Sequence, residues 1–260
     1  MPAILIAAAG VLGLLIGSFL NVVIARVPAG ESVMRPRSRC PKCGTEIRSR
    51  DNVPVLSWIL LRGKCRDCAH PISARYPAVE LLTAAVFALL AWSIGPHADL
   101  PAFLYLGAVG VALAVIDLDT KRLPNAIVLP SYPVALVALA VAALVDDAWD
   151  AYLHGLVGLA ALYAFYFVLR VLKPGGMGGG DVKLAGVLGL YLGWLGWGVL
   201  AAGAFLPFVI GGVVGIALIV SGRASRKTGI PFGPFMLSGA LIAVLAGGRL
   251  VDAYRDLTGI

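Results

Sequence analysis

Two stretches hold the side chains best suited to chemistry. Residues 175–181 read GGMGGGD and end in Asp181, at the start of a long apolar run. Asp117 and Asp119 end another apolar run, within the segment DLDTKRLPN of residues 117–125. A carboxylate at membrane depth is costly unless water, a partner or a proton compensates its charge. We therefore expect Asp181 to have a partner, and one of the other two aspartates is the candidate.

Two carboxyl groups at one desolvated site favour acid–base hydrolysis. Two apolar runs separate Asp181 from Asp117 and Asp119, so the chain returns to the same face of the membrane. Such a pair tends to share one proton: the ionised member activates a water and the protonated member polarises a carbonyl group. In a blander interpretation the first two aspartates are only helix-end acids near Lys121 and Arg122. The five glycines before Asp181 favour the catalytic interpretation, because they indicate unusual backbone angles or a close approach.

The four cysteines form two C-x-x-C pairs in one polar segment, Cys40 with Cys43 and Cys65 with Cys68. This spacing is typical of a tetrahedral zinc site with four thiolate ligands. Four cysteines leave no open position for a reacting water, so we expect a structural zinc that folds a loop with little apolar core. Reduced thiols or a disulfide are the alternatives, and a cytosolic loop favours zinc over a disulfide.

The composition indicates an all-α polytopic membrane protein. Of the 260 residues, 60% are hydrophobic and 13% are charged, and the mean hydropathy is +0.91. Soluble domains have about 25% charged residues. The first apolar run lacks the basic start of a signal peptide, so we interpret it as a retained helix. About eight spans are predicted, each near the roughly 20 residues that a spanning helix needs, at 3–25, 77–95, 100–117, 126–145, 151–170, twice within 182–220 around a turn at 193–198, and at 232–247.

Basic residues predict the orientation. Residues 26–76 contain eleven of the 21 lysines and arginines but four acids, so we place this loop in the cytosol. Counting crossings then leaves only Arg249 and Arg255 outside, together with both termini. The basic residues that give the net charge of +7 thus lie mostly on the cytosolic side. We expect anionic lipid headgroups, not nucleic acid, beside the loop. The predicted parts are a first membrane helix (1–25), a zinc-binding cytosolic loop domain (26–76) and a membrane core of about seven helices (77–260).

Several motifs give the chain a resemblance to a known family. Gly178, Gly180 and Asp181 fit the signature G-x-G-D, and residues 117–125 look like the other half of the active site in type IV prepilin peptidases. These are membrane aspartic proteases of the prepilin leader peptidase/N-methyltransferase family. The resemblance runs nearly from end to end, through GSFLNVVIARVP (17–28), RDNVPVLSW (50–58), LRGKCRDC (61–68), ISARYPAVE (72–80) and PFGPF (231–235).

The resemblance implies an activity and its residues. Asp117 and Asp181 would be the catalytic pair, with Gly178 and Gly180 supporting the second, and Asp119 is the weaker candidate. The implied reaction removes the basic leader of a prepilin or pseudopilin after a glycine, at the cytosolic face of the bacterial inner membrane. A four-cysteine loop resembles the bifunctional type, which also methylates the new N-terminal residue with S-adenosylmethionine. By the same similarity Gly63 belongs to the methyltransferase function.

Three alternatives stay open on the sequence alone. A peptidase without methyltransferase activity differs in whether the product gains one methyl group. A membrane transporter or scaffold also uses paired acids and glycine-broken helices, and an internal repeat, which we do not find, would support it. A signal-peptide-peptidase-like protease shares G-x-G-D, but the cysteine loop and residues 231–235 argue against it.

Three smaller expectations concern packing. Residues 231–235 could border the site, but a turn before the last helix is the more economical interpretation. Glu80 is interpreted either as a partner of Arg75 at the membrane interface or as a functional residue. Glycine pairs at four-residue spacing, such as Gly211 with Gly215, are expected to let helices pack closely.

Overall fold

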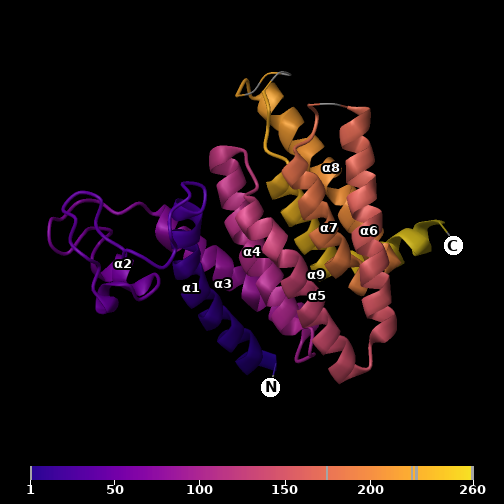
Figure 1. The fold of residues 1–260 in the computed structure, drawn as a ribbon, viewed down its shortest axis with the longest axis horizontal. Helices are drawn as coiled ribbons and strands as arrows, with labels where there is room; N and C mark the ends of the chain where they lie inside the picture. The colour runs from indigo at the N-terminus through magenta and orange to yellow at the C-terminus, as the bar shows by residue number, and fades with distance from the viewer. Residues whose placement is uncertain (1, 174, 224, 226–227, 259–260) are drawn as a thin grey trace. The chain divides into compact units, whose positions relative to one another are not determined.

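The computed structural model describes residues 2–173, 175–223, 225 and 228–258, and these are mostly helical (Figure 1). Within these ranges there is no strand, and two isolated β-bridges join Arg39 to Glu46 and Lys64 to Pro71. The predicted all-α fold is therefore confirmed. The helices are α1 (Pro2–Arg26), the 3₁₀ turn η1 (Ser49–Asp51), α2 (Leu56–Leu60), α3 (Arg75–Ile94), α4 (Leu100–Thr120), α5 (Asn125–Asp146), α6 (Trp149–Leu172), α7 (Gly179–Trp194), α8 (Trp197–Val220) and α9 (Gly233–Thr258).

Each predicted span coincides with one of the long helices. The turn expected at 193–198 lies between the end of α7 at Trp194 and the start of α8 at Trp197. By length and composition, six helices are apolar enough to cross a membrane: α1, α3, α4, α5, α6 and α8. Helix α7 has 16 residues, and the apolar part of α9 covers Gly233–Gly247. The chain is thus a multi-pass membrane protein, while the count of eight spans stays a prediction.

The first of two compact units comprises Met1–Pro96 and Gly107–Ala112. In it α1 runs along α3, and the polar loop with the four cysteines joins them (Figure 1). The two helices approach closely, since a methyl group added at Gly13 would lie 2.6 Å from Cα of Ala84. The loop therefore begins and ends on two helices that pack against each other.

The second unit, made of His97–Leu106 and Leu113–Ile260, is organised around α7. Helices α5, α6, α8 and α9 all pack against it (Figure 1). From Asp181 to Trp194 every residue of α7 is buried except the half-buried Lys183, so the helix is enclosed on all sides. A helix that is apolar all round belongs in such a position. Because α7 is enclosed, Asp181 in its first turn is held among the other helices.

Close helix packing uses Gly211 but not Gly215, and it is tightest at other glycines. Helices α6 and α7 cross at Gly158 and Gly189, where a methyl group added to either would collide with the carbonyl oxygen of the other. At Gly211 an added methyl group would lie 3.1 Å from the ring of Phe235, but at Gly215 it would meet nothing within 4 Å. The expectation for Gly215 was wrong, because the residue lies on an open face of α8 rather than at a helix crossing.

Candidate active site and metal centre

Asp117 lies in the last turn of α4 and is 4% exposed. Its Oδ2 atom accepts a hydrogen bond of 3.1 Å from the backbone N–H of Gly233, the first residue of α9. A helix N-terminus favours a negative charge, since its first N–H groups have no partner within the helix. A methyl group added at Gly233 would lie only 2.7 Å from the same Oδ2 atom. Residues 231–235 thus border the site, which corrects the interpretation of this segment as a turn alone.

Asp181 is also held by a backbone N–H at the start of a helix, in this case its own helix α7. It is the third residue of α7 and 9% exposed, and its Oδ2 atom accepts a hydrogen bond of 2.9 Å from the N–H of Gly178. Both candidate aspartates are therefore buried, and each has one carboxyl oxygen held by a backbone N–H.

Leu123, in the short segment between α4 and α5, contacts the structures that hold both aspartates. A methyl group added at Gly180 would lie 2.9 Å from Cβ of Leu123, and one added at Gly233 would lie 3.2 Å from its Cδ2. The structure thus brings the predicted pair into one site, and Gly180 is where the loop before α7 passes Leu123.

Three aromatic side chains lie beside the pair. The rings of Tyr166 and Phe208 stack with their centroids 5.8 Å apart, and Phe232 lies 5.3 Å from Phe208. Tyr166 is buried and interacts electrostatically with Asp181, while Phe232 immediately precedes Gly233. Apolar rings keep water and its dielectric screening away from a carboxyl pair. These three aromatic residues were not predicted from the sequence, although Phe232 lies within the motif PFGPF of residues 231–235.

Asp119 is exposed, in contrast to Asp117 two residues before it. Residues two apart on a helix do not share a face, so only one of the two can point toward Asp181. The contrast in burial favours Asp117 as the partner. Beyond them, Asn125 accepts a hydrogen bond of 3.0 Å from Nζ of Lys183, which joins the start of α5 to α7.

The cysteines form a separate centre in the loop. Their four Sγ atoms lie within 4.8 Å of one another, and those of Cys40 and Cys68 are 3.7 Å apart. Zn–S bonds of about 2.3 Å in a regular tetrahedron give sulfur–sulfur edges of about 3.8 Å. None of the four forms a disulfide, and the described residues hold no second such group of possible ligands. The donor set and its dimensions fit the predicted zinc.

Two similar turns present these ligands. In the first, the N–H of Cys40 donates to the carbonyl of Thr45 at 3.0 Å, and in the second, the N–H of Cys65 donates to that of His70 at 2.8 Å. Both turns contain a residue with positive φ directly after the second cysteine, Gly44 in one and Ala69 in the other. The C-x-x-C spacing therefore encodes the same local geometry twice.

The thiols interact strongly with their surroundings and one another. Hydrogen bonding with the hydroxyl and backbone of Thr45 lowers the pKa of Cys43 to about 6. The backbone N–H of His70 also lowers the pKa of Cys68. Burial and the three neighbouring thiols outweigh this effect and raise the pKa of Cys68 to about 12. Four thiolates in this volume therefore need a cation, and thiolate is the form that zinc binds.

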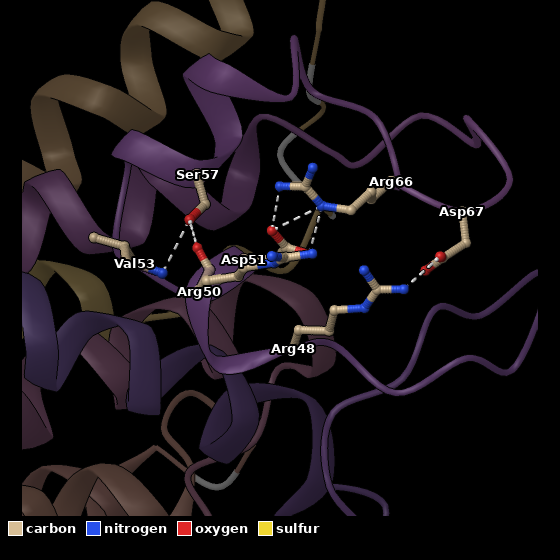
Figure 2. A network of polar contacts seen from close by, with 7 residues as sticks. All are labelled: Arg48, Arg50, Asp51, Val53, Ser57, Arg66 and Asp67. Carbon is tan, nitrogen blue, oxygen red and sulfur yellow. Dashed lines mark hydrogen bonds and ion pairs between the residues drawn. The ribbon is translucent and has the colours of Figure 1, made fainter.

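A polar network holds the second cysteine turn to the preceding part of the loop (Figure 2). Arg66 donates to both carboxylate oxygens of Asp51, at 3.0 and 2.9 Å from Nε, and Arg48 contacts Asp67 at 3.2 Å. The Arg66 guanidinium lowers the pKa of Asp51, which is itself 9% exposed. These ion pairs join residues before the second cysteine pair to residues within it, so they order the loop around the metal centre.

Gly63 and Glu80 have structural partners in the same unit. Gly63 has a positive φ of 65°, and a methyl group added there would lie 2.9 Å from the ring of Trp58. Its predicted role in methyl transfer stays a prediction.

Glu80 is buried, and its carboxylate accepts a hydrogen bond of 2.7 Å from the backbone N–H of Val55. Sequence reasoning missed this partner.

Comparisons with known proteins agree on one family. Residues 11–94 match the bacterial peptidase A24 N-terminal domain, and residues 104–220 match the type IV leader peptidase family. A protein of Stutzerimonas stutzeri named prepilin leader peptidase/N-methyltransferase is 36% identical over 97% of this chain and 94% of its own length. A Bacillus subtilis protein of the same name is 35% identical over 94% of this chain and 95% of its own. No solved structure matches the chain.

Proposed function

The chain belongs to the prepilin leader peptidase/N-methyltransferase family, and we propose that it removes the basic leader of a prepilin or pseudopilin after a glycine and then N-methylates the new terminus. The observation that carries the proposal is the buried pair Asp117 and Asp181, each with one carboxyl oxygen held by a backbone N–H. Two buried carboxyl groups on separate, fixed helices are what acid–base hydrolysis of a peptide requires.

Peptide cleavage needs one proton on the pair. The ionised aspartate takes a proton from a water, whose oxygen attacks the scissile carbonyl carbon, while the protonated aspartate gives its proton to the carbonyl oxygen. Collapse of the tetrahedral intermediate breaks the C–N bond: the leaving amine takes up a proton from one aspartate, and a hydroxyl group of the intermediate returns its proton to the other as the product carboxyl group forms, which restores one proton on the pair. No bond to the enzyme forms. The N–H groups of Gly233 and Gly178 keep the two carboxyl groups oriented throughout.

Zinc in the four-cysteine loop is proposed as a structural metal. The donor set is complete with Cys40, Cys43, Cys65 and Cys68, so no position remains for a substrate. The methyl donor is proposed to be S-adenosylmethionine, which supplies an electrophilic methyl group to the new terminal amine. Gly63 stays the candidate methyltransferase residue, on family resemblance.

The proposed orientation follows the basic residues. The loop of 26–76 lies in the cytosol, both termini lie outside, and the protein sits in the bacterial inner membrane. Residues 1–25, 26–76 and 77–260 are the proposed first helix, loop domain and peptidase core. Anionic lipids accompany the basic loop, and the substrate's apolar segment lies in the same membrane with its scissile bond at the interface.

One experiment separates the possible activities. A glycine-site prepilin is incubated in membranes that carry the wild type, Asp117→Asn, Asp181→Asn or, as the control, Asp119→Asn, and the product is weighed by mass spectrometry. Loss of cleavage in the first two variants alone supports the pair. A wild-type product heavier by one methyl group supports the second activity, whereas an unmethylated product indicates a peptidase only. Cleavage by both buried-aspartate variants would overturn the aspartate pair, and absence of cleavage by the wild type would favour a transporter or scaffold.

A further inference from the structure

The short helix α2 presents an apolar face that the loop does not cover. Leu56, Ile59 and Leu60 are 60%, 57% and 81% exposed. Their spacing puts Leu56 one helical turn from the other two, so the three side chains share a side of the helix. We call them the α2 apolar face. Three large exposed apolar side chains on one helical turn indicate an interaction surface.

The start of α2 is fixed beside a membrane helix. The N–H of Val55, directly before α2, donates to the carboxylate of Glu80 in the second turn of α3. The two residues that follow Glu80 are Leu81 and Leu82, which are 53% and 48% exposed on a helix apolar enough to cross a membrane. The α2 apolar face therefore begins at the level where α3 first presents apolar side chains to lipid.

Other contacts hold α2 in this place. Nε1 of Trp58 donates to the carbonyl of Ile72, three residues before α3, at 3.0 Å. The hydroxyl of Ser57 accepts from the N–H of Val53 and donates to the carbonyl of Arg50 (Figure 2). Val55 itself has φ 61° and ψ −50°, which is strained for a β-branched residue. The structure thus fixes α2 at both its start and its middle.

The charges around α2 indicate what covers the face. Arg50, Arg62 and Lys64 are exposed on either side of it in sequence, while Glu80 is buried against Val55 and Asp51 is paired with Arg66. Apolar side chains flanked by basic ones are typical of a segment that lies in an anionic membrane interface. A basic leader peptide would be repelled by the same arginines, so it does not fit as the occupant.

We propose that the α2 apolar face inserts into the headgroup boundary of the leaflet next to the cysteine loop, with anionic lipids around its flanking basic residues. Glu80 is the positioning residue, because its carboxylate fixes the start of α2 against α3. The inference rests on the loop and α3 alone, so it is independent of peptidase activity.

The test measures how deep the face lies in a membrane. Full-length protein carrying a fluorescent amino acid at position 60 or, as the control, at the exposed Glu46 is placed in nanodiscs containing phosphatidylglycerol. Quenching by lipids brominated near the headgroup is compared with quenching by iodide in solution. We expect lipid quenching at position 60 to exceed that at position 46 at least about threefold, with the opposite order for iodide.

Variants of Glu80 complete the test. Glu80→Ala removes the acceptor of the Val55 N–H and should lower lipid quenching at position 60, while Glu80→Gln keeps a carbonyl acceptor and should preserve it. Equal and weak lipid quenching at positions 60 and 46 would overturn the proposal and leave the face for a protein partner. Strong lipid quenching that Glu80→Ala leaves unchanged would overturn the role of Glu80.

Discussion

The four cysteines are gathered by two short turns of one loop, whereas the two aspartates are gathered by helices from distant parts of the chain. Cys40 and Cys43 lie in one turn and Cys65 and Cys68 in its near copy, so local hydrogen bonds preform the metal centre. Asp117 instead depends on Gly233, 116 residues further along. The first site should therefore need its metal to stay folded, while the second should need the exact packing of α4, α7 and α9.

Metal removal should have the largest effect, and only on the loop. Structural zinc contributes roughly 10 kcal/mol or more to the folding of small zinc-binding segments, and the loop has few buried apolar side chains of its own. We expect a chelator, or Cys40→Ser with Cys65→Ser, to remove bound zinc and expose the loop arginines to trypsin. The helices of the second unit should stay protected. Zinc content and the masses of tryptic fragments measure both results.

Substitution of a serine outside the cysteine cluster provides the control: Ser38→Ala should keep both the bound zinc and the protection of the loop from trypsin. Unchanged zinc content in the double cysteine variant would contradict the metal centre. Simultaneous loss of the second unit would contradict the independence of the two sites.

Gly233→Ala should damage the aspartate site without unfolding the protein. The added methyl group would lie 2.7 Å from Oδ2 of Asp117, so the carboxyl group or the start of α9 must move. A displacement of this kind costs on the order of 10²-fold in catalysis. Initial rates of prepilin cleavage in membranes measure it. Gly229→Ala is the matched control, because a methyl group there would meet nothing within 4 Å; equal rates for both variants would argue against the Gly233 contact.

The ion pair between Asp51 and Arg66 should make a smaller, pH-dependent contribution to the loop. Because Arg66 lowers the pKa of Asp51, the contribution is complete above the unfolded pKa and lost as the pH falls through the lower folded value. The difference in chelator resistance between wild type and Asp51→Asn should thus stay constant from about pH 8 to about pH 5 and shrink only below about pH 4. A difference that already shrinks between pH 8 and pH 5 would indicate a raised pKa instead.

The smallest expected effect is a gain in stability at Val55. Its positive φ is unfavourable for a branched side chain, and glycine adopts that conformation freely. Val55→Gly should stabilise the loop by about 1 kcal/mol, measured as the temperature at which the loop becomes sensitive to trypsin. Val53→Gly, where φ is not positive, should have the opposite sign. A loss of loop stability in both variants would show that the packing of the Val55 side chain contributes more than the strain of its backbone angle costs.

Local patterns made much of this molecule predictable. Apolar runs of spanning length gave the long helices and the turn near 193–198, and the C-x-x-C spacing gave the cysteine cluster. Asp181 and either Asp117 or Asp119 were chosen because costly charges at the ends of apolar runs need partners, and the family resemblance then favoured Asp117 over Asp119. For the helices, the turn and the cysteine cluster the signal lay within a short stretch of sequence.

Contacts through space were not predictable in this way. Nothing near Gly233 indicates that its N–H holds Asp117, and nothing near Tyr166 indicates that its ring stacks on Phe208 beside the pair. The carboxylate of Glu80 likewise accepts a hydrogen bond from the N–H of Val55, 25 residues away in the sequence. Such contacts depend on how helices cross, which a single sequence does not encode in any local pattern.

If Asp117 and Asp181 act as one unit, removing either should cost as much as removing both. We would measure cleavage rates of a glycine-site prepilin for Asp117→Asn, Asp181→Asn and the double variant, with the trypsin resistance of the second unit in each protein as the check on folding. We expect both single variants to fall by about 10³-fold or more, with the double variant no slower than either. A single variant within about tenfold of the wild-type rate, or a double variant whose loss is the product of the two single losses, would contradict the shared site.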